Sequence, residues 1–141
     1  MTVFLDRDHN AVEFADELYA KLSLNYNIEY LKSPIEKPYP IIAYNLAQKV
    51  KSTENSLGIL ICKTGIGMAI VANKVSGIYA SNCRTVKESI NFKSCNNGNV
   101  LCLGASILSI AHAAKICGTF LDTAFNVTHA GRIELINSLV E

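Results

Sequence analysis

The sequence has little excess charge and no long apolar run. Its 141 residues include 13 Lys and Arg against 12 Asp and Glu, which gives a net charge of +1. Nucleic-acid-binding proteins normally carry a clustered basic surface, so we do not expect nucleic acid as a partner. No apolar run approaches the roughly 20 residues that span a bilayer, so no membrane segment is expected. The N-terminus, "MTVFLDRDHN", reaches charged residues too early for a signal peptide, which predicts a cytoplasmic protein.

The cysteines lack the spacing of a disulfide or zinc framework. There are five, an odd number, and no two form a C-x-x-C pair. We therefore expect neither a disulfide framework nor a metal site. Most should be small buried hydrophobic residues, and their surroundings must single out any reactive one. They are Cys62, Cys83, Cys95, Cys102 and Cys117.

What the sequence does contain is a regular alternation of strand and helix patterns. The strand-like runs cover residues 2–5, 26–31, 56–62, 77–82 and 98–104. The helical patterns cover residues 11–22, 41–51, 68–75, 84–94, 106–125 and 129–141. The run "SLGILIC" at 56–62 is almost entirely apolar, which is typical of a central parallel strand buried on both faces. We predict a single α/β domain over residues 1–141, with a five-stranded parallel sheet covered by helices on both faces.

The most informative segment is "CKTGIG", residues 62–67, directly after the central strand. In parallel sheets, ligands bind outside the carboxyl ends of the strands. Gly65 and Gly67 permit a tight turn with exposed N–H groups, and the start of the next helix adds partial positive charge, so an anion would be stabilised there. The same surroundings favour a thiolate, which makes Cys62 a candidate base or nucleophile. The alternative is a glycine-rich turn beside a buried structural cysteine.

Two other segments carry polar side chains that could bind a ligand. Asp8 and His9 follow the first strand, where they could contact ligand hydroxyls, bind an anion or act as acid and base. They could equally form a polar turn that caps a helix. His129 and Arg132 lie one helical turn apart, where Arg132 could bind a phosphate, unless they form an ordinary solvated helix face.

Together these segments resemble the ribose-5-phosphate isomerase B family, which includes the subunits of galactose-6-phosphate isomerase. The resemblance runs nearly end to end, and its most specific part is the central block "GILICKTGIGMAIVANKVSGI". The other matching segments are "DH" at 8–9, "YP" at 39–40, "NNGNVLCLGA" and "HAGRI".

The resemblance implies a doubly wound, Rossmann-like domain that forms a homodimer, with each active site built from both chains. Pairing of dimers into tetramers is left open. It also implies an aldose–ketose isomerase that acts on a sugar phosphate through an enediolate, without metal or organic cofactor. Ribose 5-phosphate is the substrate we expect first.

The resemblance also implies a role for each matched residue. Cys62 would be the base that moves a proton between C1 and C2, and Thr64 would assist at the ring oxygen. The enediolate oxygens would be held by the turn amides of Lys63, Thr64, Gly65, Ile66 and Gly67. The substrate would also contact Asp8, His9, Tyr39 and Asn96, and Arg132 would bind the phosphate.

The sequence departs from the family pattern at several polar positions. Cys95 stands where the family has the histidine that opens the sugar ring, and a thiol can pass a proton but never carries the charge of an imidazolium. Ser106 and Thr128 stand where two phosphate-binding arginines are usual. Arg7 and Lys63 replace small residues beside the site. They could restore the lost positive charge, or Lys63 could crowd the turn.

These departures leave two other functions open. The chain could be a divergent subunit that is non-catalytic or depends on a partner chain, as in galactose-6-phosphate isomerase. It could also be a binding module for an unphosphorylated sugar, since fewer cations would surround the ligand.

Overall fold

A computed structural model describes residues 1–140 and contains five strands that alternate with helices, as predicted. The strands are β1 (Thr2–Arg7), β2 (Ile28–Tyr30), β3 (Ser56–Cys62), β4 (Ala80–Asn82) and β5 (Val100–Gly104). The α-helices are α1 (Val12–Leu22), α2 (Tyr39–Ser52), α3 (Ile66–Ala72), α4 (Val86–Asn96), α5 (Ile110–Asp122) and α6 (Ala130–Leu139). Two short 3-10 helices are η1 (His9–Ala11) and η2 (Val127–His129).

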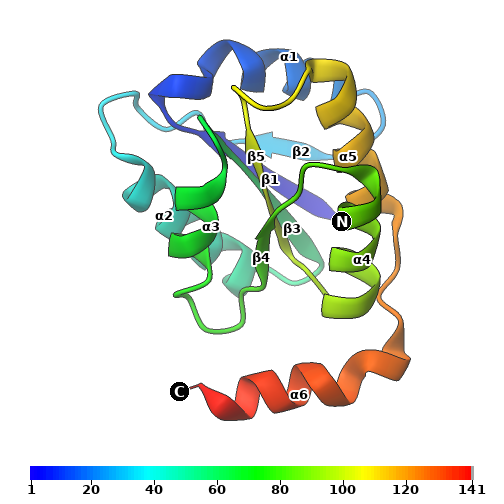
Figure 1. Ribbon diagram of the computed structural model, residues 1–141. Helices are drawn as coiled ribbons and strands as arrows, with labels where there is room; N and C mark the ends of the chain where they lie inside the picture. The colour runs from blue at the N-terminus through cyan, green and yellow to red at the C-terminus, as the bar shows by residue number, and fades with distance from the viewer. Residues whose placement is uncertain (141) are drawn as a thin grey trace.

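The five strands form one parallel sheet in the order β2-β1-β3-β5-β4 (Figure 1). From β1 the chain first adds β2 on one side and then crosses to place β3 on the other side. The carboxyl ends of β1 and β3 therefore flank a switch point, which is where open α/β sheets bind ligands. Both Asp8 and Cys62 lie there.

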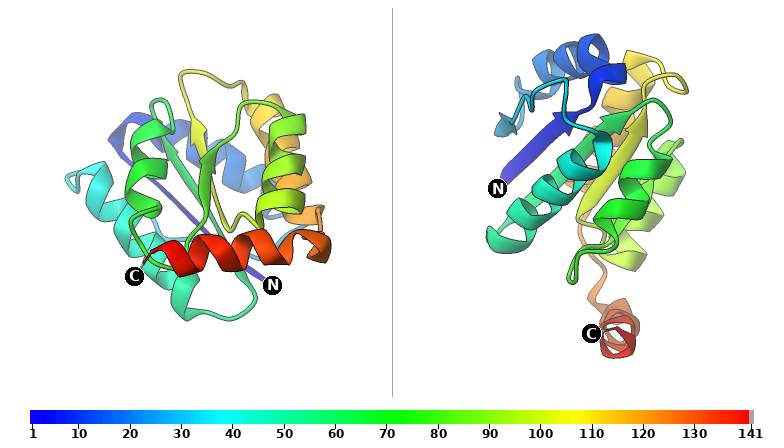
Figure 2. Two further views of the ribbon diagram at one scale, coloured as in Figure 1. Left: turned by 60° about the horizontal axis from the view of Figure 1, so that its bottom comes forward. Right: turned by 90° about the vertical axis from the view of Figure 1, so that its left-hand side faces the viewer.

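Helices cover both faces of the sheet, which confirms the predicted fold (Figure 2). Ile59 and Ile61 of β3 face a core that also contains Leu18 of α1 and Phe120 of α5. Leu60 and Cys62 face a second core, which includes side chains of α2 and α3. Because β3 is buried on both faces, its sequence needs apolar side chains at successive positions rather than at alternate ones.

Besides Cys62, three of the cysteines are core residues, as expected. Cys83, Cys102 and Cys117 are buried. Burial raises the pKa of the Cys83 thiol to about 11, and it raises the pKa of Cys102 and Cys117 as well. These three side chains therefore stay neutral near neutral pH and pack as small apolar groups.

The helix starts differ from the prediction by one to four residues, and two of the differences have a clear cause. The helix expected from residue 106 begins at Ile110, because the preceding residues form a turn and Ser109 caps the helix by accepting the His112 N–H at 3.1 Å. Helix α2 begins at Tyr39, two residues early, because Pro40 is tolerated in a first helical turn. Glu141, the last residue of the predicted final helix, lies outside the described residues.

Helix α6 lies apart from both helical layers, beside the amino ends of the strands (Figures 1 and 2). The Tyr79 hydroxyl, just before β4, donates to Asn137 Oδ1 at 2.5 Å. Ile133 is the buried side chain of α6. Large apolar side chains elsewhere at this end of the chain are exposed, namely Leu135, Ile136, Leu139 and Val140. Across residues 1–140, the structure contains no helix with the length and apolar character needed to cross a membrane.

Candidate active site

A cavity of about 460 Å³ opens between the carboxyl ends of β1 and β3. Its volume falls within the range of small-molecule sites, about 300–1,000 Å³. The residues that line it are Asp8, Asn10, Tyr39, Cys62, Lys63, Thr64, Ile66, Gly67 and Ile70. Most of the predicted site residues from the first half of the chain are thus brought together.

The turn after β3 holds the Cys62 sulfur against a backbone donor. The Gly65 N–H donates to Cys62 Sγ at 3.1 Å, and Cys62 is 7% exposed. Gly65 has φ of +85°, and a Cβ there would lie 2.8 Å from Asn82 Oδ1 and 2.9 Å from the Leu103 carbonyl carbon. Glycine is therefore required on both conformational and steric grounds. An N–H directed at the sulfur stabilises negative charge on it.

The second glycine of the turn, Gly67, leaves room for the side chain of Tyr39, which forms part of the cavity wall. A Cβ at Gly67 would lie 2.6 Å from Cε1 of Tyr39, so the tyrosine ring rests on the Gly67 backbone. Tyr39 is the first residue of α2 and lines the cavity. Gly67 thus brings the first turn of α2 against the first turn of α3.

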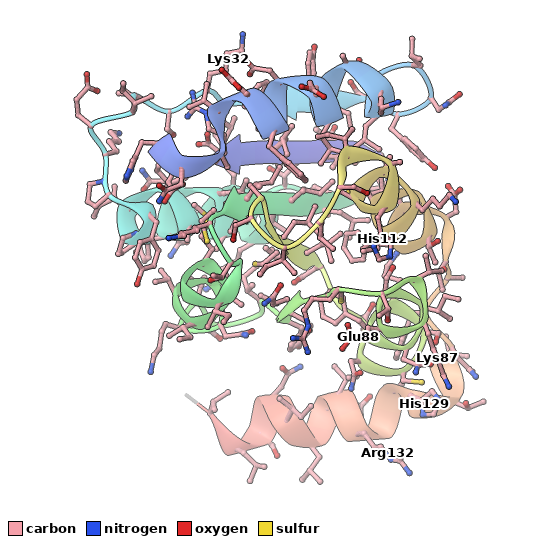
Figure 3. All side chains as sticks on the ribbon, turned by 45° about the horizontal axis from the view of Figure 1, so that its top comes forward. Lys32, Lys87, Glu88, His112, His129 and Arg132 are labelled. Carbon is pink, nitrogen blue, oxygen red and sulfur yellow. The ribbon has the colours of Figure 1, made fainter. Side chains whose placement is uncertain are left out.

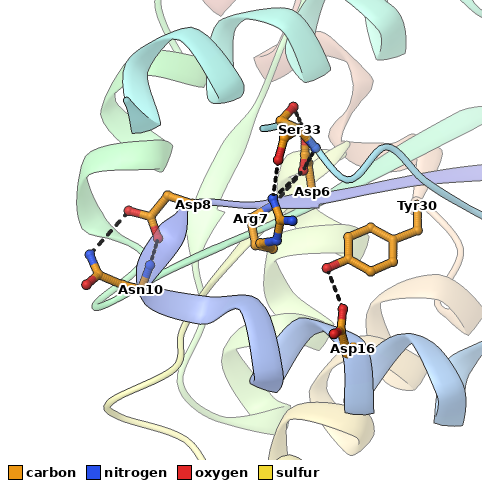
Figure 4. Close-up of polar contacts among 7 residues, drawn as sticks. All are labelled: Asp6, Arg7, Asp8, Asn10, Asp16, Tyr30 and Ser33. Atoms are coloured by element: carbon orange, nitrogen blue, oxygen red, sulfur yellow. Dashed lines mark hydrogen bonds and ion pairs between the residues drawn. The ribbon is translucent and has the colours of Figure 1, made fainter. Parts of the chain in front are cut away.

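Asp8 and His9, adjacent in sequence, face different spaces. The Asp8 carboxylate accepts hydrogen bonds from the Asn10 backbone N–H at 2.9 Å and from its side-chain amide at 3.4 Å (Figure 4). Asp8 therefore caps η1, which confirms the polar turn, and it also lines the cavity. His9 is exposed and lines a separate hollow of about 480 Å³ with Phe14 of α1 and Ala105.

Arg7 is engaged away from the cavity. Its guanidinium donates to the Ser33 carbonyl at 2.7 Å, lies 3.7 Å from Asp6 Oδ1 and packs over the Tyr30 ring (Figure 4). Asp6 also accepts the Ser33 N–H at 3.1 Å and the Ser33 hydroxyl. Arg7 therefore anchors the loop before α2 and does not replace a phosphate-binding cation in this cavity. Lys63 is the one basic residue among the described residues that line the cavity.

The remaining predicted site residues lie at the opposite end of the sheet. Cys95 and Asn96 end α4, and Arg132 is exposed on α6. Figure 3 shows Arg132 on this outlying helix and His129 directly before its start. None of these residues lines the cavity beside Cys62. One chain therefore presents two separate groups of the predicted residues.

A match to a known family shows which group of proteins the chain belongs to. A family model described as ribose/galactose isomerase matches residues 3–136. The chain belongs to this isomerase family. Over 87 residues it is 44% identical to a D-erythrulose-4-phosphate isomerase of Pectobacterium atrosepticum, a match that covers 62% of this chain and 57% of that relative. The chain thus spans a little over half the length of that relative.

Two further members of the isomerase family match more of the chain. Galactose-6-phosphate isomerase subunit LacB of Clostridium acetobutylicum is 34% identical over 127 residues, which cover 80% of this chain and 73% of the subunit. The structure of ribose-5-phosphate isomerase B of Mycoplasma genitalium, solved with bound ribulose 5-phosphate, matches with a TM-score of 0.89 and 30% identity. That match covers 98% of this chain and 95% of the other. The predicted fold and family are confirmed.

Two cavity residues of this family member, Asn10 and Ile70, were missed in the sequence, whereas Ile66 was predicted. Asn10 lies two residues after Asp8, at the position from which a turn residue donates to an aspartate. Ile66 and Ile70 both line the cavity, and both side chains are exposed. Their spacing of four residues places them on one face of α3, opposite the buried Met68. Such an exposed apolar pair, next to the predicted turn, was a usable signal for the cavity wall.

Within residues 1–140, no three His, Cys, Asp or Glu side chains come together as a metal site would require.

Proposed function

We propose that this chain is an aldose–ketose isomerase that acts on a sugar phosphate, with Cys62 as the base that moves a proton between C1 and C2. The observation that carries the proposal is the position of the Cys62 sulfur, which lines the cavity and accepts the Gly65 N–H at 3.1 Å. A thiolate held in this way is ready to accept a proton.

The turn supplies the groups that stabilise the charge formed during proton transfer. The Cys62 thiolate takes the proton from C2 of the open-chain aldose, and the electron pair moves to the carbonyl oxygen to form an enediolate. Backbone N–H groups of the turn stabilise the negative charge that develops on the oxygens. The Cys62 thiol then returns the proton to C1, while the hydroxyl proton on O2 passes to O1 and leaves the carbonyl of the ketose at C2. The Thr64 hydroxyl accepts the Ile66 N–H at 3.3 Å, which leaves its own proton for a sugar oxygen.

The site is completed by a second copy of the chain in this proposal. Within one chain, the two groups of candidate residues lie at opposite ends of the sheet. Cys95, Asn96 and Arg132 would therefore come from the partner. The exposed apolar side chains at the end of α6, including Leu135 and Leu139, support a homodimer, because apolar surface of this kind is normally covered.

The charge around the cavity bears on the choice of substrate. Ser106 and Thr128 do not supply the cations usual in the family, and Lys63 is directly adjacent to the proposed base. A four-carbon sugar would place its terminal anion closer to the reacting carbons than ribose 5-phosphate does. A four-carbon sugar phosphate is therefore a second candidate substrate. The D-erythrulose-4-phosphate isomerase that is 44% identical to this chain supports it.

The test is a direct assay of the purified protein. Ribose 5-phosphate, erythrose 4-phosphate and unphosphorylated ribose would be incubated separately, with ketose formation followed by NMR. We expect turnover of a phosphorylated sugar and a loss of about three powers of ten in kcat for Cys62→Ala, the size of a general-base contribution. Cys117→Ala, which removes a buried thiol of the core, is the matched control and should retain kcat.

Other outcomes of this assay separate the alternatives. An absence of turnover with every sugar phosphate contradicts the isomerase proposal for the chain alone. Activity that appears only after a second family member is added would identify a partner-dependent subunit, and the LacB relative, itself a subunit, motivates that arm. Saturable binding of a neutral sugar without turnover would identify a binding module.

A further inference from the structure

The segment after β5 is hydrogen-bonded to the turn that carries Cys62. The Ala105 N–H donates to the Cys62 carbonyl at 2.9 Å. Ser106 then donates twice to the Lys63 carbonyl, from its backbone N–H at 3.0 Å and from its hydroxyl at 2.7 Å. One residue of the neighbouring loop thus supplies two donors to a single peptide oxygen of the turn.

The next peptide of the turn is held on the same side by close packing. A Cβ at Gly104 would lie 2.6 Å from the Thr64 carbonyl oxygen, so this oxygen rests on the Gly104 backbone. Three successive carbonyls of the turn are therefore directed at residues 104–106. In a trans peptide the N–H points away from the C=O, so the corresponding N–H groups face the other way. The Gly65 N–H, which meets Cys62 Sγ, is one of them.

We propose that Ser106 is a positioning residue for the Cys62 thiol. Its hydroxyl fixes the orientation of the Lys63–Thr64 peptide. That peptide is joined at Thr64 to the Thr64–Gly65 peptide, whose carbonyl packs on Gly104 and whose N–H meets the sulfur, so the hydroxyl steadies the turn that presents the Gly65 N–H. Its effect on turnover rests on the proposed function, whereas its effect on the thiol does not. The position usually occupied by a phosphate-binding arginine in the family thus orients the turn in this chain.

The exposure of Ser106 makes this role separable from packing. The side chain is exposed, so Ser106→Ala removes one hydroxyl without opening a cavity in the core. The backbone bond from residue 106 remains, and the turn should loosen without unfolding. Ser106→Thr keeps a hydroxyl at the same position. Ser52→Ala is a matched control, since the Ser52 hydroxyl also donates to a backbone carbonyl, that of Gln48 at 2.9 Å, at the far end of α2.

The first measurement does not need a substrate. The rate of alkylation of Cys62 by iodoacetamide would be followed against pH, with the Cys62 peptide resolved by mass spectrometry. We expect the midpoint of the profile to move up by about half a pH unit in Ser106→Ala, because weakening one hydrogen bond to a thiolate has about this effect. Ser106→Thr should restore the midpoint and Ser52→Ala should leave it unchanged. Greater access to the sulfur would scale the rate at every pH without moving the midpoint.

The other titratable groups that face Cys62 are the same in the wild-type chain and in the three variants. They are Asp8 from the end of β1, Tyr39 from α2, Lys63 beside it and Cys102 from β5. A shift of the alkylation midpoint that occurs only in Ser106→Ala therefore results from a change in the turn.

The second measurement is kinetic. Ser106→Ala should lower kcat about fivefold with little change in KM, because the turn acts on charge that develops during the reaction. An unmoved alkylation midpoint in Ser106→Ala overturns the inference, and so does a shift that Ser106→Thr fails to reverse. Failure of the wild-type chain to turn over any sugar phosphate would remove the proposed function, while the alkylation profiles would still decide the role of Ser106.

Discussion

The two ends of the sheet present their polar residues in opposite ways. At the carboxyl end, Cys62 is 7% exposed and lies in a turn whose backbone groups are fixed by a neighbouring loop. At the amino end, Arg132 projects from a helix that lies apart from both helical layers. The first arrangement is complete within one chain, whereas the second faces outward. The candidate base is therefore positioned by contacts within the chain, whereas the proposed anion-binding group would act on the site of a second copy.

Mixing two inactive variants gives the largest effect expected from this comparison. Cys62→Ala and Arg132→Ala should each have little activity alone. If each site takes Cys62 from one chain and Arg132 from the other, a mixed dimer contains one intact site. After exchange of subunits, about a quarter of all sites should be intact, as the two-fold symmetry of such a dimer requires. The measurement is the activity of the mixture against that of each variant.

A second mixture provides the control. Asp8 and Cys62 lie at the same end of the sheet, so a mixture of Cys62→Ala with Asp8→Asn should recover no activity beyond the sum of the two. If the Cys62→Ala and Arg132→Ala mixture also recovers nothing, the shared site is contradicted.

Two glycines should respond to alanine in opposite directions. At Gly65, with φ of +85° and Asn82 Oδ1 only 2.8 Å from an added Cβ, Gly65→Ala should lower the free energy of unfolding by about 2 kcal/mol. At Gly131 on α6, nothing lies within 4 Å of an added Cβ, and Gly131→Ala should raise stability by about 0.5 kcal/mol through helix propensity. Urea unfolding of both variants measures the difference. Equal stabilities would show that the turn at Gly65 is not strained by a side chain.

The smallest expected effect separates two lysines. Lys63 lines the cavity beside Cys62, whereas Lys74 lines a hollow next to α6. Lys63→Gln should raise KM for a sugar phosphate about tenfold, since one charged hydrogen bond is lost. Lys74→Gln should leave KM unchanged. Steady-state kinetics at low ionic strength checks both, and an unaltered KM in Lys63→Gln would mean that Lys63 does not bind the substrate's anion.

Local patterns predicted the order of the elements but not all of their boundaries. The apolar run that became β3 was recognised because a strand buried on both faces needs no polar positions. The start of α5 was placed four residues too early, because Ile107 and Leu108 continue its apolar spacing. Residues 105 and 106 instead bond to the turn after β3, and a hydrogen bond between segments about 43 positions apart leaves no trace in a local pattern.

The candidate site was predicted where it follows directly from strand ends. Asp8 and Cys62 were brought together because neighbouring parallel strands end at the same edge. The burial of Arg7 was not predictable, since it depends on Asp6 and on a loop 26 positions away. The position of Cys95 could have been anticipated, because a helix that follows a parallel strand returns the chain to the opposite edge of the sheet.

The contact between Arg7 and Asp6 also constrains how the sequence can change. Asp6 is 1% exposed, and its nearest countercharge is the Arg7 guanidinium at 3.7 Å. Replacing Arg7 with a small residue would leave a buried carboxylate without that countercharge, at a cost of about 3 kcal/mol. A change at Arg7 would therefore be tolerated only together with a change at Asp6 or in the loop at Ser33. A residue that contributes no atom to the cavity thus limits which sequences can fold next to it.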